Sequence, residues 1–414
     1  CEEMDGCEDG FVEDLNAVEF VMINFIPMIM HHGDRLSEDL KEKILISIKF
    51  ALQEIEKINV SFIYTNIVAK DIVNSILGGQ LLGDSSFKNR GKEKLKEWHA
   101  HIDKSGIPTE YNSPGYSSIT INTLSNLIEL SDDDESIMIA KLILLRIGIS
   151  YALHIHPKTK RLAGPHCRAY YPYRNSPPET DGFYDHIDNG RLDKWFKKLI
   201  LNRPDTMNIR ETSDFEKKTS IGTYHGKSFS LGVTTRELDS QSNRFTSNQS
   251  SVFSIKYTQE KDDRPGIAFS KYLLNDKWLG DFRSTPSRDN TGIFFDEGSF
   301  RGIQNGKRSI NIYAPNKYNP LNLNGWNRCF SAKTCIIWDS SIDEIWINEK
   351  KVKELPIDLS PSDVIVVGSG DIFIGIKPLS LTDLGSNAPI KLIQRQEQLV
   401  LELYNYLGPA KTFW

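Results

Sequence analysis

The chain has 414 residues, of which 39% are hydrophobic and 25% are charged. This balance excludes disordered and collagen-like architectures, and the length favours two or three globular domains. The formal net charge of −5 excludes a general basic footprint for nucleic acid, so an anionic ligand needs locally placed Arg, Lys or His side chains.

The start of the chain indicates a compartment. Cys1 is followed by a run of acidic residues, as at the mature N-terminus of a bacterial lipoprotein, where the thiol carries the lipid. On this interpretation Cys1 is a lipid anchor, and the protein is extracytoplasmic, whether secreted, periplasmic or a surface lipoprotein. The alternative is that Cys1 is an arbitrary boundary of the sequence.

Residues 1–14 form a predicted tail, and residues 15–205 have the apolar period of helices. Ser37 provides a capping residue at the start of one such period. We expect the helices to pair as hairpins in a partial α/α toroid, and because the first is too short to span a bilayer, we expect no transmembrane segment. The predicted helices cover 18–30, 36–58, 60–77, 90–104, 118–131, 133–154 and 189–201.

Residues 206–414 have a period of two, which is typical of strands. Helices and strands do not alternate, so a parallel α/β sheet is disfavoured and an antiparallel β-sandwich domain is expected. The predicted fold class is therefore α+β with two domains, an N-terminal helical one and a C-terminal antiparallel one. The predicted strands cover 228–234, 251–257, 266–272, 292–295, 309–313, 334–338, 342–347, 364–367, 372–377 and 398–406.

The densest group of chemically useful residues lies at 163–174. All nine histidines precede residue 226, so imidazole chemistry must come from the helical half or from the first β segment. A Gly-Pro turn presents His166, Arg168, Tyr171 and Tyr173 from a loop, where catalytic and binding groups concentrate. His166 suits a base, Arg168 a carboxylate clamp and a tyrosine a proton donor or sugar-stacking surface. The alternative is an aromatic loop that packs between domains.

Two further groups of polar and aromatic residues lie in the predicted helical half. Asn112 and Tyr116 lie in a polar, aromatic loop, where an uncharged amide can bind a carboxylate or hydroxyls; turn and N-cap chemistry is the alternative. Tyr64 and Asn66 lie in an otherwise apolar helix, and could project into a cavity or form a satisfied buried polar cluster.

The β half starts with a glycine-rich segment that contains Tyr224 and His225. Both side chains are expected at a ligand cleft, while Gly222, Gly226 and Gly232 allow a close approach of the backbone to a ligand. The alternative is an ordinary turn at a sheet edge.

Cysteines and short motifs indicate no cofactor. Cys329 and Cys335 are close enough in sequence for a small disulfide loop, but the odd total of five cysteines argues against a thiol framework, and Cys167 is expected to be packed. His154 and His156 cannot share a helix face, which disfavours a metal site there. Because HExxH, EF-hand, P-loop and GxSxG patterns are absent, we expect neither metal nor nucleotide.

Helical hairpins before a large antiparallel domain, with these Tyr, His, Asn and Arg loops, resemble the toroid-plus-sheet polysaccharide lyases, which include the heparinase II/III and alginate lyase groups. The resemblance implies β-elimination on an acidic, uronate-containing polysaccharide, in which the carboxylate is neutralised, a base removes the neighbouring proton and an acid protonates the leaving oxygen. It implies that Asn112 and Arg168 neutralise the uronate, that His166 or His225 is the base, and that Tyr116 or Tyr171 is the proton donor.

Two alternative functions remain open at the level of sequence. One is a glycoside hydrolase, which needs a pair of carboxylates; Glu110, Asp181, Asp185 and Asp188 are available. The other is a non-catalytic carbohydrate-binding surface protein whose aromatic side chains stack on sugars.

Overall fold

A computed structural model describes residues 15–169, 181–238, 250–259, 264–275, 298–315, 329–338, 342–379, 389–395 and 397–412. The predicted tail with Cys1, the strand at 292–295, and the predicted site residues Tyr171 and Tyr173 lie outside these residues, as does the side chain of Asp181.

Contacts divide the chain into two compact units. Unit 1 contains residues 1–153, 181–201 and 211–218, and unit 2 contains residues 154–180, 202–210 and 219–414. Helices fill the N-terminal half and antiparallel strands the C-terminal half, which confirms the α+β layout. The division is not a single cut at 205, because residues 154–180 group with the strands and residues 211–218 with the helices.

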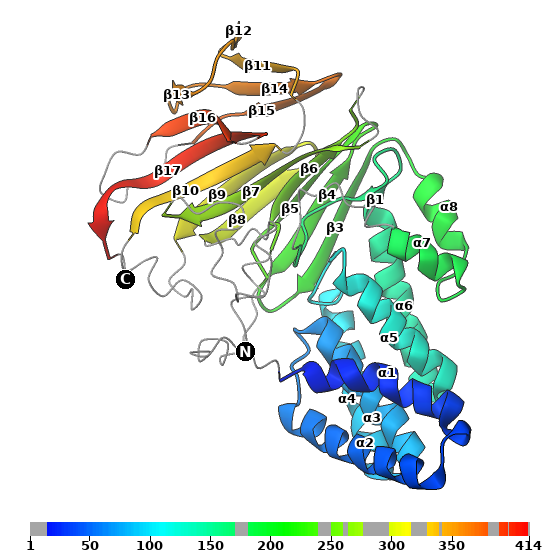
Figure 1. The fold of residues 1–414 in the computed structure, drawn as a ribbon. Helices are drawn as coiled ribbons and strands as arrows, with labels where there is room; N and C mark the ends of the chain where they lie inside the picture. The colour runs from blue at the N-terminus through cyan, green and yellow to red at the C-terminus, as the bar shows by residue number, and fades with distance from the viewer. Residues whose placement is uncertain are drawn as a thin grey trace. The chain divides into compact units, whose positions relative to one another are not determined.

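The helices of unit 1 surround a buried central helix, α3, whose residues are buried from Thr65 to Gly79. Helices α1, α2, α4 and α5 all contact α3 (Figure 1). Ser37 caps α2, because its Oγ accepts a hydrogen bond from the backbone N–H of Leu40, as the sequence predicts. The helices are α1 Ala17–His32, α2 Glu38–Ile58, α3 Thr65–Leu82, α4 Ser85–Ser105, α5 Tyr116–Leu130, α6 Asp134–His154, α7 Asp181–Asp188 and α8 Trp195–Leu201.

Helix α6 is long and apolar enough to cross a membrane, with a mean hydropathy of 1.8 over its most apolar window. Half of that window is buried inside the fold. Core helices have the same length and composition, so these properties do not by themselves indicate a membrane span.

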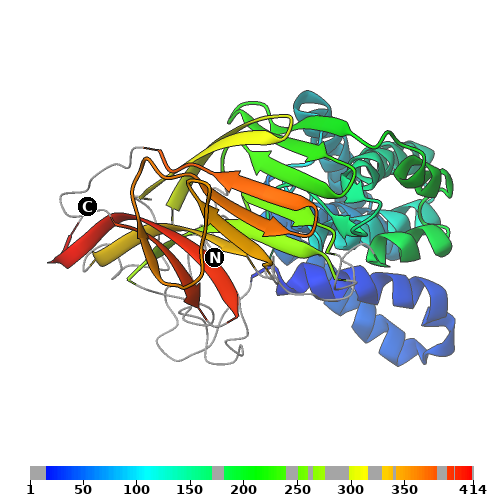
Figure 2. The same cartoon turned by 90° about the horizontal axis from the view of Figure 1, so that it is seen from above.

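A nine-stranded sheet organises the second half of the chain, in the order β13-β16-β17-β10-β7-β6-β5-β4-β3 (Figure 1), and Figure 2 shows the strands from above. A second sheet has the order β12-β11-β14-β15, and β1-β2 and β8-β9 form hairpins. The strands are β1 Ile155–His156, β2 Arg161–Leu162, β3 Met207–Asp214, β4 Thr219–His225, β5 Phe229–Thr234, β6 Phe253–Tyr257, β7 Gly266–Leu274, β8 Gly298–Asn305, β9 Arg308–Pro315, β10 Cys329–Trp338, β11 Glu344–Ile347, β12 Lys350–Lys351, β13 Ile357–Leu359, β14 Ile365–Ser369, β15 Ile372–Ile376, β16 Ile390–Arg395 and β17 Gln398–Lys411.

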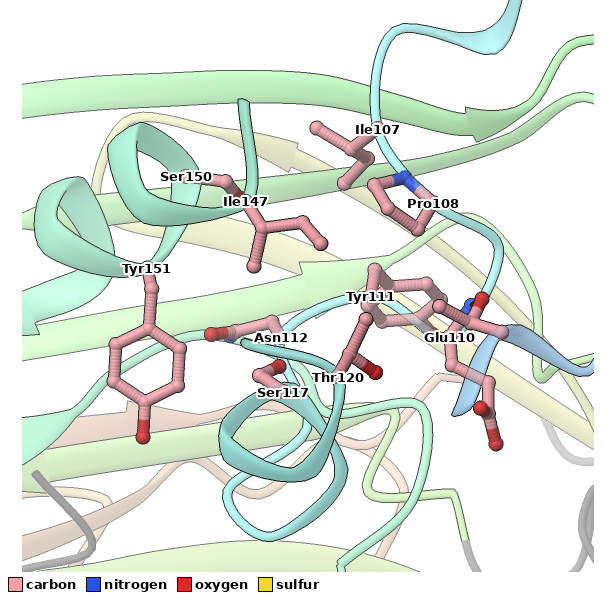
Figure 3. A pocket seen from close by; sticks show the side chains of 11 residues that line it. Ile107, Pro108, Glu110, Tyr111, Asn112, Ser117, Thr120, Ile147, Ser150 and Tyr151 are labelled. Carbon is pink, nitrogen blue, oxygen red and sulfur yellow. Dashed lines mark hydrogen bonds between the residues drawn. The ribbon is translucent and has the colours of Figure 1, made fainter. Parts of the chain in front are cut away.

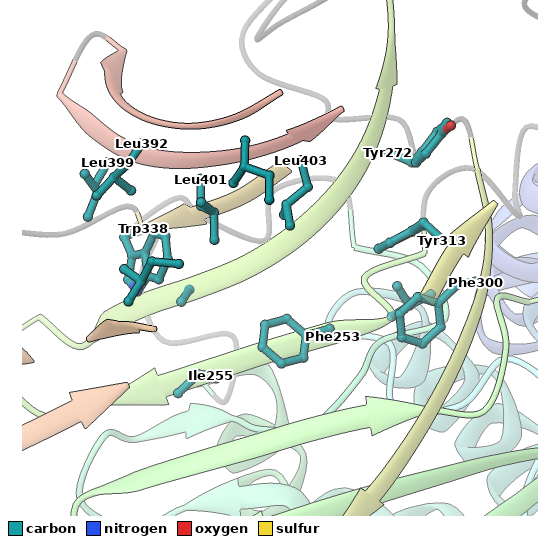
Figure 4. Close-up of a cluster of buried hydrophobic side chains, with 14 of the residues drawn as sticks. Phe253, Ile255, Tyr272, Phe300, Tyr313, Trp338, Leu392, Leu399, Leu401 and Leu403 are labelled. Carbon is teal, nitrogen blue, oxygen red and sulfur yellow. The ribbon is translucent and has the colours of Figure 1, made fainter. Parts of the chain in front are cut away.

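The nine-stranded sheet has two buried faces, since successive side chains of a strand point to opposite sides. The first, here the core face, carries Trp338 and Leu401 and packs against β14 and the β8–β9 hairpin in one large apolar cluster (Figure 4). The second, here the lysine face, carries Phe269 and Ile337 in a smaller cluster, together with buried Lys256, Lys271 and Lys333.

Cys329 and Cys335, which are close enough in sequence for a small disulfide loop, do not form one. Both cysteines are free and buried on the same strand, β10. Six positions of extended chain span roughly 20 Å, whereas a disulfide needs Cα atoms within about 7 Å. Cys167 is free and fully buried, in agreement with its expected packing.

Candidate functional site

A line of polar side chains crosses three neighbouring strands on the lysine face. His225 of β4 lies opposite Ser230 of β5, and Ser230 lies opposite Lys256 of β6. All three side chains are at most 2% exposed. The pairing register therefore places an imidazole, a hydroxyl and an amine side by side in a dry environment.

The segment that carries His166 lies on these strands. The backbone of His166 exchanges two hydrogen bonds with Ser251, each 2.9 Å long. Lys256 Nζ donates to the carbonyl oxygen of Leu162 at 2.7 Å and lies 3.4 Å from His166 Nε2. Two of the predicted catalytic residues, His166 and His225, thus lie on the same sheet face with Lys256, which the sequence analysis missed.

Gly232 lets the segment lie this close to the sheet. A Cβ atom at this position would lie 2.1 Å from Gly164 Cα and 2.5 Å from the nitrogen of Pro165. Ser254 Oγ also donates to the carbonyl oxygen of Gly164, at 2.5 Å. Gly232 was expected to allow a ligand close to the backbone. Instead, the missing side chain leaves room for the backbone of Gly164 and Pro165, and this contact positions His166.

A third histidine, His156, supports the same group. Its ring stacks on His225 with 5.5 Å between ring centroids. The backbone N–H of Thr159 donates to Nδ1 at 3.1 Å, so Nε2 carries the hydrogen and donates to the carbonyl oxygen of Gly226 at 3.0 Å. Burial lowers the pKa of His156 to about 4, and the ring is therefore neutral near pH 7.

The group can move a proton beside a positive charge. Lys256 Nζ lies 3.4 Å from His166 Nε2, and a protonated amine at this position can only donate to that nitrogen. A neutral imidazole is a competent base near pH 7, and a cation in a dry site stabilises developing negative charge strongly. Arg168, two positions beyond His166, is also buried and adds a second cation to this segment.

Tyr224 does not join His225. The two residues are consecutive in β4, and Tyr224 lies opposite Leu231 of the core face. There the ring centroids of Tyr224 and Phe229 are 5.6 Å apart. The prediction that both side chains face one cleft is wrong, because adjacent residues of a strand point to opposite faces.

The other predicted residues belong to unit 1. Asn66 is fully buried, and both its backbone N–H and its Nδ2 donate to Glu110 Oε2 at 2.8 Å. Lys70 Nζ donates to Asn66 Oδ1 at 3.2 Å. This arrangement agrees with a satisfied buried polar cluster. Its hydrogen bonds engage Glu110, one of the carboxylates that a glycoside hydrolase would need. Asp188, another of them, pairs with Lys197 at 2.5 Å.

Asn112 and Glu110 line a small pocket with Tyr111, Ser150 and Tyr151 (Figure 3). The cavity measures about 20 Å³, which is enough for a water molecule. The backbone of Asn112 has a φ of 45°, a left-handed conformation that asparagine tolerates well, in agreement with turn chemistry at this position.

The two predicted tyrosines of unit 1 start helices. Tyr64 is the half-buried N-cap residue of α3, and half-buried Tyr116 is the first residue of α5, where its backbone N–H donates to Ser113 Oγ. Within the described part of the chain, no three His, Cys, Asp or Glu side chains are placed to hold a metal ion.

Comparisons with known proteins match one family model and a solved structure to this chain. A family model described as a domain of unknown function (DUF8769) matches residues 12–176. The comparison with curated proteins found no match. A solved structure of a heparinase III with methylated lysines is 8% identical with a TM-score of 0.36, and the match covers 96% of this chain. This chain spans only 65% of the length of that heparinase III. A TM-score this low does not establish a shared fold, so the functional assignment rests on the residues of the chain.

Proposed function

We propose that the chain is a polysaccharide lyase that cleaves an acidic, uronate-containing polysaccharide by β-elimination. The observation that carries the proposal is the group formed by His166, His225 and Lys256 on the lysine face, with Lys256 Nζ 3.4 Å from His166 Nε2. The arrangement of the helices as a partial α/α toroid before a β-sandwich belongs to the same proposal.

The proposed reaction uses a base and a cation. His166 or His225 removes the proton from the carbon beside the uronate carboxylate, and Lys256 stabilises the negative charge that develops there. The electron pair forms a carbon–carbon double bond as the glycosidic bond breaks, and Tyr171, the predicted donor of the same unit, returns a proton to the leaving oxygen. Arg168 is the proposed partner of the carboxylate, and Tyr173 is a further proposed binding residue. Of the other predicted binding residues, Tyr64, Asn66 and Asn112 belong to unit 1, and Tyr224 lies on the core face.

The test is the ultraviolet absorbance of the conjugated uronate that elimination creates and hydrolysis does not. The purified chain is incubated with a panel of uronate polysaccharides, and absorbance and reducing ends are measured in parallel. We expect absorbance to rise with one member of the panel. New reducing ends without absorbance would indicate a hydrolase, and silence in both measurements would favour a carbohydrate-binding protein.

Variants test the residues. We expect His166→Gln or His225→Gln to lower kcat about 100- to 10,000-fold, depending on which is the base. Lys256→Met should also lower kcat, whereas His31→Gln, on an exposed helix end, should leave it unchanged. If Lys256 and His166 only hold residues 162–168 on the sheet, these variants lower the melting temperature and leave the activity of the folded fraction intact.

A further inference from the structure

The β8–β9 hairpin has one buried and one exposed face. Phe300 and Tyr313 point into the large apolar cluster and are 0% and 8% exposed. The opposite face carries Ile303, Ile310 and Ile312, which are 66%, 53% and 57% exposed. We call these three residues the isoleucine face.

The pairing register of β8 and β9 places the three isoleucines next to one another. Ile303 lies directly opposite Ile310, and Ile312 is the next residue of β9 on the same side. Arg301 lies opposite Ile312. Three large aliphatic side chains therefore form one patch in water, which is uncommon on a surface that has no partner.

Positive charge lies at one end of this patch. Residues 298–315 contain Arg301, Lys307 and Arg308 and no acidic residue, although the whole chain has a net charge of −5. Arg301 pairs with Glu237 at 3.3 Å. Lys307 and Arg308, at the turn and start of β9, are exposed and have no ion-pair partner in the described ranges. The hairpin thus ends in two available cations.

We propose that the β8–β9 hairpin docks on an anionic phospholipid surface, with the isoleucine face in the interface and Lys307 and Arg308 against lipid phosphates. Aliphatic side chains gain from leaving water, and each cation near an anionic bilayer adds to the attraction. A second copy of the chain fits less well, because pairing through the same hairpin offers Lys307 and Arg308 no acidic partner. The isoleucine face has no aromatic ring to stack on a sugar, which disfavours a polysaccharide as the partner.

The experiment measures sedimentation of the full chain with vesicles of phosphatidylcholine alone and with added phosphatidylglycerol. We expect binding only to the anionic vesicles and a decrease as salt rises. Lys307→Glu/Arg308→Glu should weaken binding at least roughly 25-fold, since each basic residue contributes a factor of about five. Ile303→Ser/Ile310→Ser/Ile312→Ser should reduce binding at least tenfold, on the order expected for lost apolar burial.

Controls carry matched changes elsewhere. Lys49→Glu/Lys350→Glu alters the same charge on exposed residues outside the hairpin, and Phe373→Ser removes an apolar side chain that is 60% exposed. Both should bind as wild type. Loss of vesicle binding in the charge variant but not in the isoleucine variant would indicate a soluble polyanion as the partner and overturn the proposal. An isoleucine-dependent dimer in gel filtration, or equal binding to neutral vesicles, would overturn it as well.

Discussion

At the residue scale, His156 links the candidate site to pH. Burial lowers its pKa to about 4, against about 6.5 in an unfolded chain. Between these values the unfolded state binds more protons than the folded state, so stability must rise with pH across this window. His156 therefore favours folding fully above pH 6.5, and this advantage is lost as the pH falls toward about 4.

The predicted loss is on the order of 3 kcal/mol from this group. Urea unfolding of the wild type and of His156→Gln at several values between pH 7 and pH 4 measures it. Glutamine can keep one donor and one acceptor but does not titrate, so the variant should have a flatter stability profile. If the free energy of unfolding depended on pH equally in the two proteins, His156 would not be the source of the pH dependence.

A second residue-scale prediction concerns the buried ion pair on the lysine face. Lys333 Nζ lies 2.7 Å from Glu402 Oε1, and the two side chains are 1% and 4% exposed. Burial raises the pKa of Tyr404 to about 12, so its hydroxyl stays protonated and donates to Glu402 Oε2 at 2.9 Å. Removing only the lysine leaves a buried carboxylate with too little compensation.

We expect Lys333→Met to destabilise the fold by about 3–5 kcal/mol, and Lys333→Met/Glu402→Leu to recover most of that loss. Denaturant unfolding measures both. Lys57→Met is the matched control, since Lys57 pairs with Glu54 at 2.6 Å on an exposed helix surface. It should cost less than about 1 kcal/mol. An equal cost at the two sites would contradict the role of burial.

At the scale of elements, Gly232 in β5 holds the His166 segment against the sheet. Any Cβ here meets backbone atoms of Gly164 and Pro165, which cannot rotate away as a side chain could. We expect Gly232→Ala to displace this segment, cost about 1–3 kcal/mol and remove His166 from Lys256. The proposed lyase activity should fall with stability. Gly375→Ala in β15, where a Cβ meets nothing within 4 Å, should change neither.

Apolar periodicity predicts the existence of the helices better than it predicts where they begin and end. The helix at 36–58 is recognisable because apolar spacing and the Ser37 cap agree, and the structure has α2 at Glu38–Ile58. Helix α4 starts at Ser85, earlier than predicted, because Asp84 accepts the N–H of Ser86 and extends a polar first turn. The predicted helix at 189–201 is shorter in the structure, since Gly190 adopts a φ of +76° and α8 starts only at Trp195; α7, which ends at Asp188, was not predicted.

The residues of the candidate site could be predicted only in part, because their proximity depends on contacts between distant parts of the sequence. His166 and His225 stand out by residue type, but their proximity depends on strand register and on Gly232, neither of which is local in sequence. Lys256 sits in an apolar strand and gives no motif. The prediction for Tyr224 was wrong because residue type alone does not determine on which face of the strand a side chain lies.

At the scale of the whole molecule, the two units share the chain in alternating pieces. Residues 211–218 complete unit 1, where the N–H of Ile107 donates to the carbonyl oxygen of Thr212 and Ser150 Oγ donates to Glu211. Residues 154–169 complete unit 2, where the bridge between His166 and Ser251 fixes them to the sheet.

Cutting the chain at 205 should therefore leave two incomplete units. The fragment 1–205 lacks the partners of Ile107 and Ser150, and the fragment 206–414 lacks the segment that covers Lys256. We expect neither fragment to melt cooperatively when produced alone, whereas the intact chain does. Co-expression of the two should restore a cooperative transition, because every contact within each unit is then present. Cooperative melting of both fragments alone would show that the exchanged segments contribute little, and would restore the boundary at 205 as a true domain border.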